Sequence, residues 1–272
     1  MFSSAAPTRT APPRTKRSET LARLRAQIAR IEHADTSRAV RSIPFGIPAL
    51  DHAAPLLLGS LHEVAGAGPD TEHGAAAALF LAGVLARLEG PVLWVQERPD
   101  LFAPGLACVG LHPARLIFVE AGKDVLAAME EGLAHPGLAA VVGEYSGRLS
   151  LVASRRLQLG AEKSGVMAAL LRRSLVFNDP ELAAPSAAVT RWRIAALPSA
   201  PPLPHAPSVP GLGRALWQLE LTHCRGGALG RGGLGQGGET GSWIVEACDA
   251  TGRLALAADV ADGSAAATGR AA

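Results

Sequence analysis

Residues 59–86 read GSLHEVAGAGPDTEHGAAAALFLAGVLA and predict a short strand, a glycine-rich turn and a helix, in that order. The strand covers residues 61–64, the turn covers about 65–73, and the helix begins near Gly74. A strand, a Gly-rich turn and the opening of a helix form the skeleton of a phosphate-binding loop. The stretch therefore predicts the first unit of a nucleotide-binding type of fold.

The chemistry of such a loop is absent from the stretch. A working loop has the pattern G-x-x-x-x-G-K-[ST], in which the Lys reaches the β- and γ-phosphates and the hydroxyl helps to hold Mg²⁺. Here Gly66, Gly68 and Gly74 lack that spacing, four alanines follow Gly74, and the stretch contains no Lys. Asp70 and Glu72 add negative charge where a triphosphate needs positive charge. We therefore predict that the scaffold is kept, that the nucleotide site is lost, and that the protein uses no cofactor.

Composition places the chain among folded proteins that work in a reducing compartment. Its 272 residues are 48% hydrophobic, enough for a large core in one principal domain with tails. The three cysteines are scattered and odd in number, which argues against a disulfide framework, and no metal-ligand spacing appears. The longest apolar run, residues 75–86, is too short to span a bilayer. We expect a soluble, cytoplasmic protein without a metal site or membrane contact.

The N-terminal region is basic. Residues 1–41 hold eight Arg and one Lys against three acidic side chains. Residues 1–17 have the composition of a disordered segment, whereas Ser18 can cap an amphipathic helix over about 19–33. That helix either packs on the neighbouring domain or contacts a partner or DNA.

Strand and helix signals alternate beyond residue 90. Short apolar runs predict buried parallel strands, and the segments between them predict helices. The predicted strands are 92–96, 116–119, 138–142 and 166–171, and the predicted helices are 101–109, 123–134 and 151–163. Such regular alternation is typical of an α/β fold with a mostly parallel central sheet flanked by helices.

The pattern changes after Arg173. Period-two alternation predicts a small, partly solvated antiparallel extension with strands at 190–196, 215–223 and 242–248. A Pro-rich connector, 198–210, and a Gly-rich connector, 226–241, separate these strands. We divide the chain into a basic N-terminus at 1–40, an α/β core with a degenerate phosphate loop at 41–176, the rest of the core with the β extension at 177–248, and a flexible tail at 249–272.

The order of these segments resembles the RecA-like family and, within it, the ImuA proteins of bacterial mutagenesis cassettes, over about residues 40–250. The resemblance begins at SIPFGIPALD (42–51), which is similar to the lead-in of a RecA core. It continues through PVLWVQERPDLFAPGLACVGLHPARLIFVEA (91–121), where Glu97 falls close to the glutamate that activates water in RecA-type enzymes. The segment LAAVVGEYSGRL (138–149) resembles a Walker B strand with Gly143 at the aspartate position and Glu144 one residue later. The segments that resemble those marking ImuA proteins are 151–160, 188–195 and 225–227.

This resemblance implies a non-catalytic accessory role in damage-induced, error-prone translesion DNA synthesis, part of the SOS response. It implies contacts with an ImuB-like protein, a homologue of Y-family polymerases without polymerase activity, and with an error-prone C-family DNA polymerase. RecA is a further candidate partner. Two alternatives stay open: a DNA-dependent ATPase or recombinase-like protein with an atypical nucleotide loop, and a SulA-like inhibitor of cell division.

Two carboxylates stand at the ends of predicted strands, where open α/β folds place their ligands. A catalytic interpretation makes Glu97 the general base for attack of water on a γ-phosphate. Positioning dominates phosphoryl transfer, and nothing in the loop anchors a phosphate. The alternative is that Glu97 and Glu144 are surface or salt-bridged carboxylates, and we expect no enzymatic activity.

Arginines form the other candidate site. Arg191 and Arg193 alternate with Trp192 and Ile194 in a predicted strand, so both arginines should point away from the core. Arginine patches bind phosphate backbones or acidic partner surfaces, although ordinary solvated arginines with local ion pairs are equally consistent with the pattern. The candidate contacts to a partner or to DNA are Arg155, Arg156, Arg172, Arg173, Arg191, Arg193 and Arg225.

Four further side chains have simpler interpretations. Trp217 and Trp243 are predicted core residues of the β extension. His62 and His73 flank the degenerate loop, and we expect them to be solvated or to cap the helix.

Overall fold

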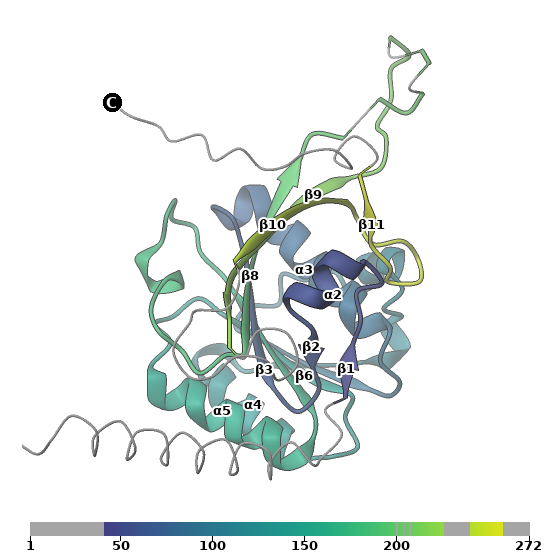
Figure 1. Ribbon diagram of the computed structural model, residues 1–272. Coiled ribbons are helices and arrows are strands. Elements are labelled where there is room, and N and C mark those ends of the chain that lie inside the picture. The colour runs from purple at the N-terminus through teal and green to yellow at the C-terminus, as the bar shows by residue number, and fades with distance from the viewer. Residues whose placement is uncertain (1–40, 200, 204, 207, 226–239, 258–272) are drawn as a thin grey trace, which may run out of the picture. The chain divides into compact units, whose positions relative to one another are not determined.

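A large sheet runs through the part of the chain that the structure, a computed structural model, describes: residues 41–257 except 200, 204, 207 and 226–239 (Figure 1). The basic helix predicted at 19–33 and most of the Gly-rich connector lie outside these described residues. The strands, in order across the sheet, are β11 (Ala255–Leu256), β10 (Gly241–Glu246), β9 (Leu216–Cys224), β8 (Thr190–Leu197), β3 (Leu61–Gly66), β7 (Met167–Arg172), β6 (Ala140–Tyr145), β4 (Val92–Gln96) and β5 (Leu116–Glu120).

Strand direction confirms the predicted α/β class. The strands from β8 to β5 run parallel to their neighbours, and β9, β10 and β11 are antiparallel. One prediction was wrong: β8 does not start a separate antiparallel extension but pairs in parallel with β3. The reason is burial, because Trp192 and Ile194 on β8 are at most 1% exposed and share the apolar core of the parallel strands.

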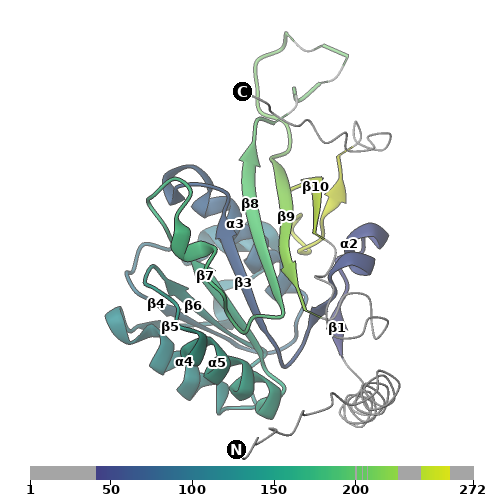
Figure 2. The same cartoon turned by 60° about the vertical axis from the view of Figure 1, so that its left-hand side comes forward.

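Helices cover both faces of the sheet (Figure 2). On one face α3 (Asp70–Ala86) packs against β3 and β8, and the short α2 (Pro48–Ala53) joins the same core. On the other face α4 (Val125–Leu133) packs against β6 and β4, and α5 (Leu151–Ser164) packs against β3 and β7. The remaining elements are β1 (Ser42–Ile43), which pairs with β2 (Leu56–Leu57), and the 3₁₀ helices η1 (Ala103–Val109), η2 (Pro113–Arg115), η3 (Gly122–Asp124) and η4 (Pro180–Leu182).

Predicted boundaries of β4, β5, β6, β7, α4 and α5 agree with the structure to within three residues. Three predictions need correction. The segment 101–109, predicted as an α-helix, is the 3₁₀ helix η1, because Gly105 weakens an α-helix and Gly110, with φ of 88°, ends the segment. The run at 116–119, predicted to be fully buried, is the edge strand β5, in which Ile117 is 47% exposed. Strand β3 extends to Gly66 and α3 begins at Asp70, so the loop between them is shorter than predicted.

The apolar run at 75–86 lies inside α3, as predicted, and much of this helix is buried. Its small side chains let other segments approach closely: a Cβ added to Gly83 would stand 2.3 Å from Cys248 Sγ. Trp192 lies in the core on the α3 side of the sheet. Its ring centroid is 5.4 Å from that of Phe45 and 6.1 Å from that of Trp243. The predicted core tryptophans are confirmed, since Trp217 is buried and Trp243 is half-buried against Trp192. No helix among the described residues has the length and hydropathy needed to cross a bilayer.

His62 is not solvated, contrary to the prediction. Its side chain is 1% exposed, with Nδ1 2.7 Å from Thr190 Oγ1 and Nε2 2.9 Å from Leu57 O. A carbonyl oxygen only accepts, so Nε2 donates to Leu57 and Nδ1 accepts the hydroxyl proton of Thr190. Burial lowers the pKa of His62 to about 4, against the raising effect of the bond to Leu57. His62 is therefore a neutral core residue that ties β3 to β8.

Candidate functional site

The loop between β3 and α3 consists of residues 67–69 only. The helix begins four residues before Gly74, where the sequence pattern placed its start. Pro69, with φ of −58°, stands at the N-cap, and Asp70 in the first turn complements the positive end of the helix. A loop this short cannot wrap a phosphate in the manner of G-x-x-x-x-G-K-[ST].

Backbone hydrogen bonds close this loop. The N–H of Ala67 donates to Ile194 O at 2.9 Å, and the N–H of Asp70 donates to Ser174 O at 2.8 Å. A phosphate-binding loop instead leaves such N–H groups pointing at the ligand. Strand β8 and the segment after β7 therefore occupy N–H donors that a nucleotide would need.

The glycines in and beside the loop before α3 serve close packing. A Cβ on Gly66 or Gly68 would lie 3.0 Å from atoms of His73, and a Cβ on Gly74 would lie 3.1 Å from Asp70 Cβ. His73 in turn accepts a hydrogen bond on Nδ1 from the N–H of Ala196 at 3.1 Å. His73 thus links α3 to β8, and its neighbouring glycines give it room.

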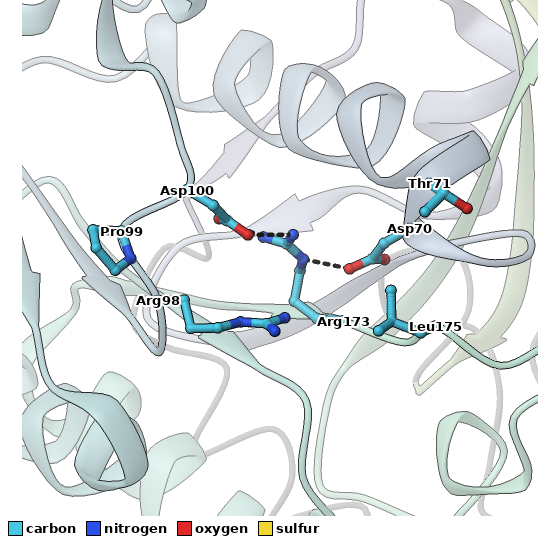
Figure 3. Close-up of a pocket in the computed structure, with 7 residues that line it drawn as sticks. All are labelled: Asp70, Thr71, Arg98, Pro99, Asp100, Arg173 and Leu175. Carbon is cyan, nitrogen blue, oxygen red and sulfur yellow. Dashed lines mark hydrogen bonds and ion pairs between the residues drawn. The ribbon is translucent and has the colours of Figure 1, made fainter.

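An arginine stands at the mouth of α3 (Figure 3). Arg173 follows β7 and donates from Nε to Asp70 Oδ2 at 2.5 Å and from Nη1 to Glu144 Oε2 at 2.5 Å. Its Nη1 and Nη2 also donate to the two oxygens of Asp100, at 3.3 and 3.1 Å. We call these four residues the Arg173 cluster. The cluster brings the chain's own carboxylate and guanidinium groups to the place where a helix N-terminus would otherwise receive a phosphate.

Burial strengthens the ion pairs of the Arg173 cluster, because water screens buried charges less than exposed ones. The side chains of Glu144 and Asp70 are 2% and 9% exposed, whereas that of Asp100 is 46% exposed. Burial opposes the charge of Arg173, but the hydrogen bonds to Asp70 and Asp100 and the charge of Glu144 outweigh it, so the pKa of Arg173 is raised. Burial raises the pKa of Glu144, although a 2.7 Å bond from Trp94 Nε1 and the charge of Arg173 oppose the shift. Arg173 therefore remains charged and holds these carboxylates together.

The Walker-B-like residues point to opposite faces of β6. Glu144 faces the Arg173 cluster. Gly143 faces α4, and a Cβ there would stand 2.1 Å from Met129 Sδ. An aspartate at position 143 would thus collide with the core instead of reaching the cluster. The carboxylate that does reach the cluster is bound to Trp94 and Arg173.

Glu97 follows β4 but does not belong to the cluster. Its Oε2 accepts hydrogen bonds from the N–H of Ser146 at 3.0 Å and from the Ser146 hydroxyl at 2.6 Å. This pair links the segments that follow β4 and β6. Glu97 thus has a structural contact that accounts for its position at the strand end.

The candidate arginines fall into two groups. Arg172 is 3% exposed and lies 3.6 Å from Glu63, which is also within 3.7 Å of Arg191. Together with Arg173, these arginines bind internal carboxylates. Arg155 and Arg225 are exposed, Arg193 is half-buried, and Arg156, 65% exposed, pairs with Glu130 at 2.5 Å. Arg191 and Arg193 lie on the face of β8 opposite to the buried Trp192 and Ile194, as predicted. Arg191 does not point into solvent, however, because its side chain is 14% exposed and lies 3.7 Å from Glu63.

A pocket of about 530 Å³ opens over the Arg173 cluster (Figure 3). Its lining residues are Asp70, Thr71, Arg98, Pro99, Asp100, Arg173 and Leu175. With Glu144 beneath it, three carboxylates meet two arginines here, so the pocket suits a cation better than a triphosphate. Among the described residues no group of three or more His, Cys, Asp or Glu is placed to hold a metal ion.

Sequence patterns did not point to Asp100, Arg98 or the exposed segment 175–177. The residues of this segment, Leu-Val-Phe, are each at least 59% exposed although the segment begins three positions after the end of the buried strand β7. The one available signal was this apolar triplet in a segment otherwise typical of a loop. No local sequence pattern pointed to Asp100 as a site residue, because its partner Arg173 lies 73 residues away in the chain.

Fold and site together define an α/β protein with a mostly parallel sheet and an ion-pair cluster at the N-terminus of α3. No protein-family model matches the chain. It is similar to the proteins named Protein ImuA of two strains of Caulobacter vibrioides, with 41% identity over 221 residues, which cover 76% of this chain and 84% of each relative. The chain belongs to the ImuA family.

Proposed function

We propose that this protein is a non-catalytic accessory protein of damage-induced, error-prone translesion DNA synthesis. The observation that carries the proposal is the Arg173 cluster, whose guanidinium and three carboxylates stand at the mouth of α3. Phosphoryl transfer depends on a positioned phosphate and on groups that neutralise its charge. This site offers excess carboxylate and no lysine. Membership of the ImuA family supports the biological setting.

The protein acts, in this proposal, through contacts with an ImuB-like protein and an error-prone C-family DNA polymerase, with RecA as a further candidate. Arg155, Arg156, Arg193 and Arg225 are the candidates for contacts to these partners or to DNA, because their side chains are at least partly exposed. The remaining candidate arginines, Arg172, Arg173 and Arg191, bind internal carboxylates, so we assign them to the architecture.

A nucleotide titration tests the proposal. The full-length protein is titrated with a fluorescent ATP analogue and Mg²⁺, with and without single-stranded DNA, beside a RecA-type ATPase as the positive control. We expect no saturable binding up to about 1 mM nucleotide, a concentration that would detect even weak sites. Saturable binding with DNA-stimulated hydrolysis that is lost in Glu97→Gln would instead establish the ATPase alternative.

Genetic complementation tests the pathway. In cells that lack the gene, the wild-type protein and Glu97→Gln should restore damage-induced mutation equally, because Glu97 serves only a structural contact in this proposal. Cell length is measured in the same cultures. Filamentous growth on overexpression, without an effect on mutation frequency, would favour the SulA-like alternative.

A further inference from the structure

Four exposed, large apolar side chains lie in the two segments that contribute Asp100 and Leu175 to the pocket over the Arg173 cluster. Phe102 follows β4, and Leu175, Val176 and Phe177 follow β7. They are 74%, 65%, 59% and 64% exposed, respectively. We call these four residues the apolar rim. Soluble proteins seldom leave neighbouring large apolar side chains in water unless the surface binds something.

Topology places the rim at one edge of the sheet. Strands β7, β6 and β4 are adjacent and parallel, so the segments that follow them leave from the same edge. Leu175 lines the pocket together with Asp100, two residues before Phe102. A Cβ on Gly68 would lie 3.6 Å from Phe177, which places this ring over the loop before α3.

The backbone that carries the rim is held in place. Ser174 Oγ lies 2.7 Å from Asp179 Oδ2 and accepts a hydrogen bond from the N–H of Val176 at 3.1 Å. Asp179 Oδ1 also accepts from the N–H of Glu181 at 2.9 Å. The segment between β7 and η4 is thus fixed by its own hydrogen bonds. A surface ordered in advance loses less entropy when a partner binds.

Charge identifies the kind of partner. Beneath the rim, Asp70, Asp100 and Glu144 outnumber the arginines Arg173 and Arg98. Asp100 is 46% exposed, so its charge is accessible from the pocket. An arginine or lysine combines a long apolar stem with a terminal cation, and this combination matches an apolar rim around an acidic pocket. A nucleic-acid backbone would meet the exposed carboxylate of Asp100 with like charge.

We propose that the apolar rim and the pocket between its segments form a docking site for a protein segment that presents Arg or Lys between apolar side chains. The inference deepens the proposed function, because it rests on an accessory role through protein contacts. The cation of the segment meets Asp100, and its apolar neighbours cover Leu175 and Phe177.

Peptide binding to the full-length protein tests the site. Two fluorescent pools of peptides of about twelve residues carry the same Leu and Phe positions, with a central Arg or Lys in one pool and a central Glu in the other. Fluorescence anisotropy at physiological salt should show binding of the basic pool and at least about tenfold weaker binding of the acidic pool. Equal binding of the two pools, or no binding of either, would overturn the proposal.

Variants locate the binding. Leu175→Asp and Phe177→Asp should each weaken binding of the basic pool by about tenfold or more. Leu256→Asp is the matched control, because Leu256 is 50% exposed on β11 at the far side of the sheet, and it should bind as the wild type does. These three positions are exposed, so the substitutions should not disturb the fold. If the circular dichroism spectrum of a rim variant shows misfolding, Val176→Asp, also at an exposed position, replaces it.

Two outcomes assign the site to another occupant. A concentration-dependent dimer in sedimentation velocity that disappears in Phe177→Asp would make a second copy of this chain the occupant and overturn the assignment to a basic partner segment. Binding of single-stranded DNA that is lost in the rim variants would overturn it as well. If neither peptide pool binds and the protein also binds no nucleotide, the docking site is excluded and the accessory role stands. If the protein binds nucleotide saturably, the non-catalytic accessory role is itself excluded.

Discussion

Arg173 Nε donates to Asp70 Oδ2 over 2.5 Å, and this bond joins the residue after β7 to the first residue of α3. Arg173 also binds Glu144, the last residue but one of β6, and Asp100, which follows β4. One guanidinium therefore connects the segments at one edge of the sheet. In many proteins with a phosphate loop, the N-terminus of the helix that follows the loop binds a phosphate. In this protein the connection is made by the chain itself, so it should be measurable as stability.

We expect Arg173→Ala to lower the free energy of unfolding by about 3 kcal/mol, because it leaves the buried carboxylates of Glu144 and Asp70 without a cation. Urea denaturation followed by tryptophan fluorescence measures the change. The matched control is Arg98→Ala, an exposed arginine of the same pocket, which should shift stability by less than about 0.5 kcal/mol. Equal losses in the two variants would contradict a structural role of the Arg173 cluster.

His62 should make stability depend on pH. Its pKa is about 4 in the folded protein and 6.5 ordinarily, so the unfolded chain binds more protons between these values. The stabilisation is therefore complete above about pH 6.5 and is lost as the pH falls toward 4, by at most about 3 kcal/mol. In His62→Gln the slope of unfolding free energy against pH should flatten in this window. The exposed His135→Gln should keep the wild-type slope, and an unchanged slope in His62→Gln would refute the assignment.

Gly143 should tolerate no side chain. We expect Gly143→Ala to cost about 1–3 kcal/mol, since the new methyl group would stand 2.1 Å from Met129 Sδ. Gly137→Ala is the matched control, because a Cβ there meets nothing within 4 Å. Thermal unfolding of the two variants measures the difference. Similar melting temperatures would mean that α4 can move away from β6, and that an aspartate at position 143 would fit after all.

Glu63 should be more important for stability than its position in the middle of β3 suggests. It is 5% exposed as a side chain and lies within 3.7 Å of both Arg172 and Arg191. Removing one partner of a buried ion pair typically costs about 3–5 kcal/mol, and we expect this loss in Glu63→Ala. Glu181→Ala breaks a solvent-exposed pair with Arg148 and should cost less than about 1 kcal/mol. A small loss for Glu63→Ala in urea denaturation would show that solvent reaches these arginines.

Local sequence pattern was sufficient for most helices and strands. Strand β4 has the predicted bounds, and α5 begins where expected because Ser150 caps it, its Oγ accepting from the N–H of Ala153. The start of α3 was predicted four residues too late. Pro69, whose φ of −58° suits a helix start, and the backbone hydrogen bonds of Ala67 and Asp70 outweighed the glycine pattern. The parallel pairing of β3 with β8 was also missed, because it joins residues more than a hundred positions apart, whose pairing no local pattern records.

The sequence by itself determined the α/β class and the absence of the G-x-x-x-x-G-K-[ST] pattern from residues 59–86, because alternating apolar runs and a missing lysine are local properties of the chain. Only the tertiary structure decided which side chains meet at the N-terminus of α3. Arg173 and Asp70 are separated by 103 positions, and Arg173 looked like a surface arginine in the sequence. They meet because parallel strands bring their carboxyl ends to one edge of the sheet, where buried charges must find partners.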